Sequence, residues 1–440
     1  MLSSTKLLNS LMLLLLAAFA VKAYSVSFAN GNAPANLRWK AATISIGISA
    51  SLLSESSNIK RGSDVEGAVE RSLEAWQRTA NIEFRQYAAK ELSASPAGPS
   101  GDGISLITIA QTPENVLLFA KDPELVAATT RVFYNGRGVI TEADIVLNPY
   151  QQFSTDGTIG TFDLESAITH ELGHLLGLEH SPLLASTMYE NYGKNGVYGL
   201  NSFNARTLSA DDIAAVRAIY GPKDSETACC GTISGKLNVT GIKSLKNAEI
   251  WLEDSVTGRV QSRTRAAADG VFTISGLAPG DYRVFAEVEG ANAVFQPQEI
   301  GEAAIIKGES TEFAGRFTAR EGGMRINYVG FNGQLSGLPI QLSAGKTYTV
   351  YLGGTSLDAK TATVGINSPF FDVVAGSLRQ HDYGDQVSVI SFEVRVGAET
   401  PSGDFSIEVT NSEGGKAYIR SGLTVDEFAN PFSILTSVND

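Results

Sequence analysis

Three of the four histidines in this chain of 440 residues lie within eleven positions, and this cluster constrains the fold more than any other feature. The segment, His170 to His180, reads HELGHLLGLEH. Residues i and i+4 share one face of an α-helix, so His170 and His174 are predicted to project together from consecutive turns. Gly177 allows the helix to end in a left-handed conformation, after which the chain can turn back and bring in His180.

Three imidazoles suit a zinc ion that keeps a fourth position open for water, as catalytic zinc sites do. Zinc lowers the pKa of bound water toward ~7, and a neighbouring carboxylate can take the proton as the water attacks a carbonyl. Glu171 is the candidate general base and the later proton donor to the leaving amine. Met188 follows His180 at the distance expected of a methionine turn. The residues therefore predict hydrolysis of peptide bonds with one catalytic zinc.

Several segments together resemble the metzincin metallopeptidases, and more narrowly the matrixin branch. They are Ser181 directly after the third histidine, ADIVLN, FDLESAITHELGHLLGLEHS and LSADDIAAVRAIYG. The resemblance covers roughly residues 37–221. It implies that Met188 forms a hydrophobic floor beneath the zinc, and that Tyr189, Glu190 and Tyr192 form a wall of the substrate pocket. Matrixins usually carry Pro-x-Tyr in this wall, whereas this chain keeps Tyr192 and lacks the proline, which leaves the pocket's preference open.

The same resemblance bears on other metal sites and on latency. Asp144 aligns with a position that binds structural calcium in related enzymes, and Asp156 lies in a plausible loop, although solvated loop aspartates are the alternative reading. The second, structural zinc of animal matrixins is not expected, because the remaining histidine, His381, is distant in sequence and is expected at the surface. A cysteine-switch mechanism is not expected either, since no cysteine precedes the catalytic segment.

The order of strands and helices predicts an α+β domain, and the resemblance implies that it is a catalytic domain built on a twisted mixed sheet with three helices. Helices are expected at residues 64–79, capped by Ser63 or Asp64, at 163–176, and at 209–220, capped by Ser209. Alternating apolar residues predict strands at residues 43–50, 81–87, 104–110, 129–134 and 138–148.

Beyond residue 231 the pattern changes to short alternating runs separated by turns, which predicts two successive β-sandwiches. Residues 231–317 resemble transthyretin-like, carboxypeptidase-regulatory domains through GTISGKL and DGVFTISGLAPGDYRVFAE, and residues 318–428 resemble immunoglobulin-like domains through ETPSGDFSIEVTN. The full division expected is a signal peptide at 1–23, a peptidase domain at 28–222, a linker at 223–230, the two sandwiches, and a tail at 429–440. In the linker, Cys229 and Cys230 are expected as free or oxidised thiols, with a vicinal or interchain disulfide as the alternative.

The N-terminal segment predicts export, because Lys6 precedes an apolar run too short to span a membrane and small residues follow it. The protein is therefore expected to be secreted, with periplasmic or cell-surface locations as alternatives, and to carry no transmembrane segment after cleavage. A net charge of −13 argues against nucleic acid as a partner. Protein or peptide substrates are expected. The competing interpretation is a surface or matrix-binding protein whose β domains recognise a glycan or matrix ligand and whose metal domain is structural or self-processing.

Overall fold

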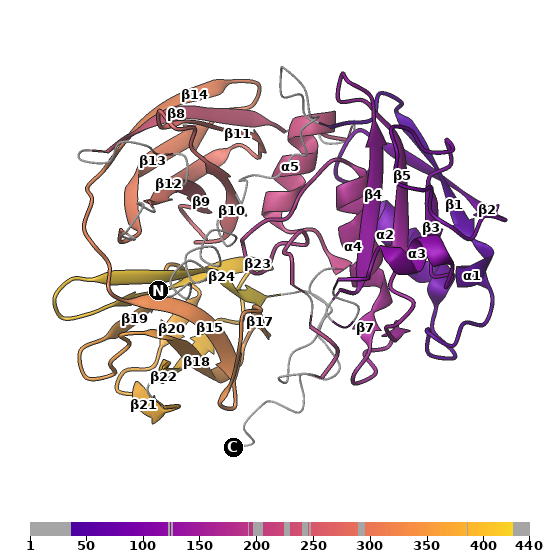
Figure 1. Cartoon of the computed structure of the whole chain (residues 1–440). Coiled ribbons are helices and arrows are strands. Elements are labelled where there is room, and N and C mark those ends of the chain that lie inside the picture. The colour runs from indigo at the N-terminus through magenta and orange to yellow at the C-terminus, as the bar shows by residue number, and fades with distance from the viewer. Residues whose placement is uncertain are drawn as a thin grey trace, which may run out of the picture.

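The computed structural model describes residues 37–121, 124, 126–191, 193–196, 206–223, 229–239, 245, 248–288, 295–384 and 386–425. The predicted signal peptide, the tail at 429–440 and Tyr192 lie outside these residues. The chain forms three parts (Figure 1): an N-terminal domain up to residue 223, a first β domain (residues 231–317) and a second β domain (residues 325–425). An α+β domain followed by β domains is the predicted fold class.

The N-terminal domain is built on a five-stranded mixed sheet in the order β2-β1-β3-β5-β4. Four strands run parallel, and β4 lies antiparallel to β5 at one edge of the sheet. The bounds are β1 Thr43–Ser49, β2 Glu83–Ala89, β3 Leu106–Thr108, β4 Ala128–Tyr134 and β5 Ile140–Leu147; β6 Phe153–Ser154 and β7 Phe162–Asp163 form a separate pair. All five predicted strands are present.

The three predicted helices are α2 (Val65–Gln77), α4 (Leu164–Leu175) and α5 (Ala210–Tyr220). Each begins after a side chain that accepts a hydrogen bond from the helix's own backbone, namely Asp64, Asp163 and Ser209. Two short helices, α1 (Ala50–Leu53) and α3 (Pro113–Leu117), were not predicted. They are too short to display a helical repeat of apolar residues.

Helix α4 is buried almost completely, and α2 packs against it. The two helices are also joined by polar bonds, because the indole of Trp76 donates to the carbonyl of Thr169 at 2.9 Å and the hydroxyl of Ser72 donates to that of Glu165 at 3.1 Å. The helix that carries two of the clustered histidines is therefore fixed within the core of its domain.

Each β domain encloses one hydrophobic core between two sheets. The first contains the sheets β10-β9-β12-β13 and β11-β8-β14; the second contains β16-β15-β18-β22-β20, with β21 on β22, and β17-β24-β23-β19. The strands of the first are β8 Gly231–Val239, β9 Glu249–Asp254, β10 Val260–Arg265, β11 Val271–Leu277, β12 Gly280–Glu287, β13 Gln298–Ile305 and β14 Ser310–Phe317. Those of the second are β15 Arg325–Phe331, β16 Gln334–Ser336, β17 Ile340–Leu342, β18 Thr347–Thr355, β19 Thr363–Ile366, β20 Phe371–Val373, β21 Arg379–Asp382, β22 Ser388–Val396, β23 Gly403–Thr410 and β24 Lys416–Val425.

The domains are in direct contact. Helix α5 lies between the rest of the N-terminal domain and the first β domain (Figure 1) and contacts β10 and β11. The approach is close, since a Cβ atom on Gly276, which has a φ of +74°, would collide with the carbonyl oxygen of Ala214. The two β domains are joined by the ion pair of Arg420 with Glu249, at 2.6 Å.

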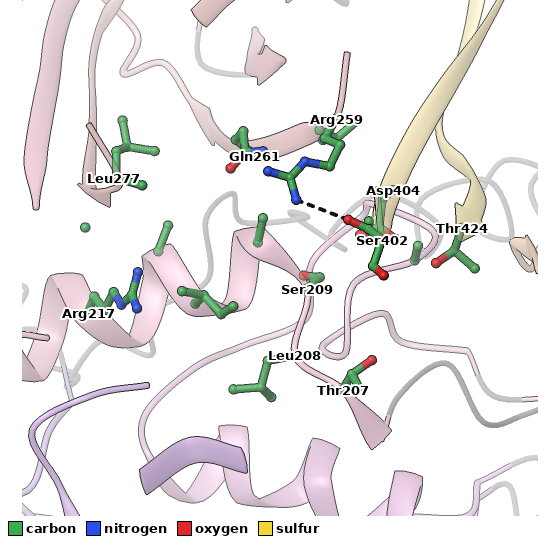
Figure 2. A pocket seen from close by; sticks show the side chains of 18 of the residues that line it. Thr207, Leu208, Ser209, Arg217, Arg259, Gln261, Leu277, Ser402, Asp404 and Thr424 are labelled. Carbon is green, nitrogen blue, oxygen red and sulfur yellow. Dashed lines mark hydrogen bonds between the residues drawn. The ribbon is translucent and has the colours of Figure 1, made fainter. Parts of the chain in front are cut away.

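A pocket of about 450 Å³ lies where the three parts meet (Figure 2), lined by α5, by strands of the first β domain and by the start of β23 and the end of β24. On its wall, Arg259 donates to the carbonyl of Ser402 at 3.1 Å. None of the clustered histidines is among its described lining residues. Ala185 and Ser209, which flank the methionine turn and α5, are among them.

Free or oxidised thiols were expected at the domain junction, and this expectation is wrong: Cys229 and Cys230 are joined in the vicinal disulfide that was the alternative. Neighbouring cysteines lie close together in any fold, so the sequence shows that they can pair but does not show whether they are oxidised. Within the described residues, no helix combines the length and the apolar character needed to cross a membrane.

Candidate metal centre

The three clustered histidines converge on one point. His170 and His174 project from α4, and His180 arrives after the turn that follows the helix. The Nε2 atoms of His170 and His174 are 3.0 Å apart, and those of His174 and His180 are 3.2 Å apart. Two ligands of a tetrahedral zinc ion are expected about 3.3 Å apart. Within the described part of the chain, these residues form the one group of three or more His, Cys, Asp or Glu side chains that could hold a metal.

The other ring nitrogens decide what these short distances mean. The Nδ1 of His170 lies 2.7 Å from the carbonyl oxygen of Thr187, and the Nδ1 of His174 lies 2.8 Å from that of Leu178. A carbonyl oxygen only accepts, so each Nδ1 must carry the proton in the neutral ring. The two Nε2 atoms therefore face each other with lone pairs at 3.0 Å, which is repulsive unless a cation lies between them. The residues fit a metal ion that accepts three imidazole nitrogens.

The environment keeps these rings neutral. Burial lowers the pKa of His170 well below its ordinary value, and the neighbouring imidazoles lower it further. Burial likewise lowers the pKa of His174 to about 4 and lowers that of His180. Neutral imidazole is the form that binds metals, so the site is ready for a cation near pH 7. His180 is the most exposed of the three residues, although its surroundings partly desolvate the ring, and His170 is fully buried, so the centre is open to solvent from one side.

Glu171 lies beside this centre on β4's side of the helix. Its Oε2 accepts a hydrogen bond from the hydroxyl of Thr130 in β4 at 2.6 Å. Burial raises the pKa of the Glu171 carboxyl to about 7, and the bond from Thr130 opposes this rise. A carboxyl with a pKa near neutrality can both accept and release a proton at physiological pH, as a general base and acid must.

Met188 is buried beneath α4, directly against Gly173. A Cβ atom at Gly173 would collide with the sulfur of Met188 and would stand 3.0 Å from the ring of Trp76. The glycine inside the histidine segment is therefore needed so that the methionine can pack directly against the helix.

Helix α5 holds the turn before Met188 through hydrogen bonds to Asp212. The carboxylate of Asp212 accepts from the hydroxyl of Ser186 at 2.8 Å and from the backbone N–H of Thr187 at 2.7 Å. Burial, with a contribution from the neighbouring Asp211 carboxylate, raises the pKa of Asp212 to about 6. Because the carbonyl of Thr187 orients His170, Asp212 acts on the metal centre through one intervening residue.

The predicted pocket wall is only partly described. Tyr189 is half-buried, Glu190 is exposed, and Tyr192 lies outside the described residues. Burial raises the pKa of the Tyr189 hydroxyl.

The candidate calcium residues are separate from the histidine group. Asp144 is buried, its two oxygens accept from the backbone N–H groups of Ser95 at 2.8 Å and Leu106 at 3.1 Å, and burial raises its pKa to about 7. Asp156 lies in an exposed loop and pairs with Lys60, which lowers its pKa to about 2. His381, predicted at the surface, is half-buried, and its ring packs at a tilt against that of Tyr351, with ring centroids 4.9 Å apart.

Three residues that contact the candidate site residues, directly or through one intervening residue, were not predicted from the sequence: Thr130, Thr187 and Asp212. Thr130 belongs to a predicted strand but lies 41 positions from Glu171, and nothing in the strand pattern marks it. Asp212 also takes part in the N-terminal cap of α5, because its backbone N–H donates to the hydroxyl of Ser209 at 3.3 Å. Its second task, at the methionine turn, needs the tertiary structure.

Three imidazoles that could hold a metal ion thus lie beside a buried carboxylate and a buried methionine, and comparison with known proteins bears on what this arrangement does. Residues 38–221 match the model of the family described as Matrixin. The chain is 29% identical over 190 residues to human matrix metalloproteinase-20, covering 43% of this chain and 34% of that protein. It is 29% identical over 168 residues to metalloendoproteinase 1-MMP of Arabidopsis thaliana, covering 36% of this chain and 38% of that protein. These matches support a matrixin-type zinc metallopeptidase domain in the N-terminal part of the chain.

The chain spans little more than a third of the length of these relatives. A solved structure of BcpA, the major pilin subunit of Bacillus cereus, matches with 15% identity and a TM-score of 0.18, covering 43% of this chain and 66% of that one. A likeness this weak carries no argument about the β domains.

Proposed function

We propose that the protein is a secreted zinc endopeptidase that cleaves peptide bonds in protein substrates. The observation that carries the proposal is the pair of Nε2 lone pairs held 3.0 Å apart by two backbone carbonyls, with a third imidazole and the buried carboxylate of Glu171 beside them. Few arrangements other than a catalytic cation site account for that combination.

In this proposal His170, His174 and His180 hold the zinc ion and Met188 forms the floor beneath it. When bound, zinc supplies a Lewis acid that lowers the pKa of water toward ~7 and polarises a carbonyl group. Glu171 takes the proton of the attacking water and later donates it to the leaving amine. Thr130 holds the Glu171 carboxylate in one orientation through the bond at 2.6 Å.

The substrate is proposed to bind as an extended strand along β4. This strand lies at the edge of the sheet, beside α4, so its free backbone groups can pair with a peptide. Tyr189, Glu190 and Tyr192 would then form a wall of the pocket for the side chain after the scissile bond. The two β domains are proposed to be transthyretin-like and immunoglobulin-like sandwiches that bind a surface, glycan or matrix ligand, or space the peptidase from it.

Calcium is proposed as a structural ion near Asp144. The buried Glu142 contributes a negative charge close to Asp144, and its Oε1 has no hydrogen-bond partner among the described residues. A cation there would offset the cost of two buried carboxyl groups. We expect calcium to raise the thermal stability of zinc-loaded wild-type protein but not of the Asp144→Ala variant. Asp156 is the weaker candidate, because Lys60 already pairs with it.

The test compares zinc-loaded wild type with the Glu171→Gln variant on an unfolded generic protein. We expect the activity of the variant to be about 10²–10⁴-fold lower than that of the wild type, while it keeps one zinc per chain, since it lacks only the proton acceptor. Glu179→Gln is the matched control, because it makes the same change next to His180 without touching the centre, and it should cleave like the wild type. Equal activity of Glu171→Gln and wild type would refute the role of Glu171. Inactive, folded and zinc-loaded wild type would favour the binding-protein interpretation.

A further inference from the structure

The loop that follows the third histidine and the first β domain both donate hydrogen bonds to one carboxylate of α5. Asp211, at the start of α5, is buried, and one of its oxygens accepts from the hydroxyl of Ser181 at 2.8 Å. Its other oxygen accepts from the hydroxyl of Ser262 and from the backbone N–H of Arg263, both at 3.0 Å. Ser262 and Arg263 belong to β10 of the first β domain. Asp211 therefore bonds to two domains at once.

Ser181 connects Asp211 to the metal centre. It directly follows His180, and its backbone N–H donates to the carbonyl of Met188 at 2.8 Å. This bond joins the two ends of the segment between the third histidine and the methionine turn. A displacement of Ser181 would therefore move His180 and loosen the closure of the methionine turn.

A buried series of charges continues from Asp211 into both β domains. The guanidinium of Arg263 is 1% exposed, and it acts electrostatically on Asp211 while its Nη1 lies 3.5 Å from Glu249 in β9. Glu249 in turn pairs with Arg420 of β24, at 2.6 Å. Buried ion pairs of this kind are costly to break, because removing one partner leaves an uncompensated charge.

The second β domain touches the same segment at separate points. Leu184 packs against the core of the second β domain, and the hydroxyl of Tyr189 lies 3.9 Å from the position of a Cβ on Gly337. The segment 181–189 is thus contacted by α5 and by the second β domain, and Asp211 of α5 links it to the first β domain.

We propose that Asp211 is a positioning residue for His180 and that the hydrogen bonds from β10 hold Asp211 in place. The β domains would then form part of the scaffold of the metal centre. The inference rests on the proposed function only in taking His170, His174 and His180 as metal ligands. It does not require peptidase activity, and its test is metal binding.

The experiment measures zinc affinity by competition with a chelator, and the absorption spectrum of the cobalt-substituted full-length protein, which reports ligand geometry. The variants are Asp211→Asn, Ser262→Ala, Arg263→Met and Arg263→Lys. The control is Ser421→Ala, which alters a buried serine of β24 whose hydroxyl has no hydrogen-bond partner within the described residues. Folding of each variant is checked by circular dichroism.

We expect Asp211→Asn and Arg263→Met to bind zinc about 10–100-fold more weakly, the range typical of residues that orient metal ligands, and to show an altered cobalt spectrum. Ser262→Ala removes one of two bonds from β10 and should weaken binding about 2–10-fold. Arg263→Lys keeps the cation and should remain closer to wild type than Arg263→Met, while Ser421→Ala should equal wild type.

Wild-type affinity and an unchanged cobalt spectrum in folded Asp211→Asn and Ser262→Ala would overturn the inference. If Asp211→Asn or Arg263→Met does not fold, Ser262→Ala decides the question alone. Wild-type protein that binds zinc without cleaving peptides would refute the proposed function and leave this inference standing, whereas wild-type protein that binds no zinc would overturn both.

Discussion

Replacing Gly173 by alanine separates what helix propensity predicts from what the structure predicts. In an isolated helix, glycine to alanine stabilises by about 1 kcal/mol. Here the new Cβ would collide with the sulfur of Met188, which is 1% exposed and cannot turn toward solvent, and would press on the ring of Trp76. Overpacking of a core costs about 1–3 kcal/mol, and a collision with a fully buried atom lies at the upper end. We therefore expect Gly173→Ala to destabilise the N-terminal domain by about 2 kcal/mol net.

The assay is calorimetric unfolding of the full chain in the presence of a chelator, so that zinc binding does not contribute to stability. A loss of about 2 kcal/mol corresponds to a fall in the Tm of the N-terminal domain of about 4–8 °C. The matched control is the double variant Gly173→Ala/Met188→Ala. Met188→Ala alone should cost about 2–5 kcal/mol, and removing its side chain should abolish the collision. The double-mutant cycle should therefore show that Gly173→Ala and Met188→Ala together cost up to about 3 kcal/mol less than the sum of the two single losses. Stability of Gly173→Ala at or above wild type, or additive losses in the cycle, would refute the packing argument.

Three further predictions follow from other contacts. Thr130→Val removes the bond to Glu171 and should lower kcat/KM about tenfold without changing zinc affinity, because Thr130 does not touch the imidazoles; an unchanged kcat/KM would contradict its role. Lys60→Ala should destabilise by less than about 1 kcal/mol, with the full effect above pH ~4. Lys60 lowers the pKa of Asp156 in the folded protein to about 2. The ion pair therefore stabilises the fold above the unfolded-state pKa of Asp156, and this contribution is lost as the pH falls toward 2. Urea unfolding of wild type and variant at several pH values would show this. Gly276→Ala should separate α5 from β11, since its Cβ would meet the carbonyl of Ala214 and its φ is +74°. Calorimetry should then show the N-terminal domain and the first β domain unfolding in two transitions that are better separated than in the wild type. An unchanged profile would contradict the close approach.

Much of the N-terminal domain was predictable because its signals are local. The apolar repeat of α2 and the caps Asp64 and Ser209 lie within a few residues of the helices they define. The spacing of His170 and His174 places both on one helical face wherever that helix lies. The short helices α1 and α3 escaped prediction because four or five residues do not establish a period.

Local spacing was enough to predict that the three imidazoles meet, because His170, His174 and His180 lie within one helix and the turn after it. How this candidate centre is held depends on contacts between distant parts of the chain. Thr130 reaches Glu171 across 41 positions, and Asp211 meets Ser262 across 51 positions and a domain boundary. No local pattern encodes such contacts, since they depend on how the sheet, α5 and β10 pack. The physical reason is that helical periodicity acts over a few residues, whereas burial and hydrogen bonding of a carboxylate are properties of the whole packed interior.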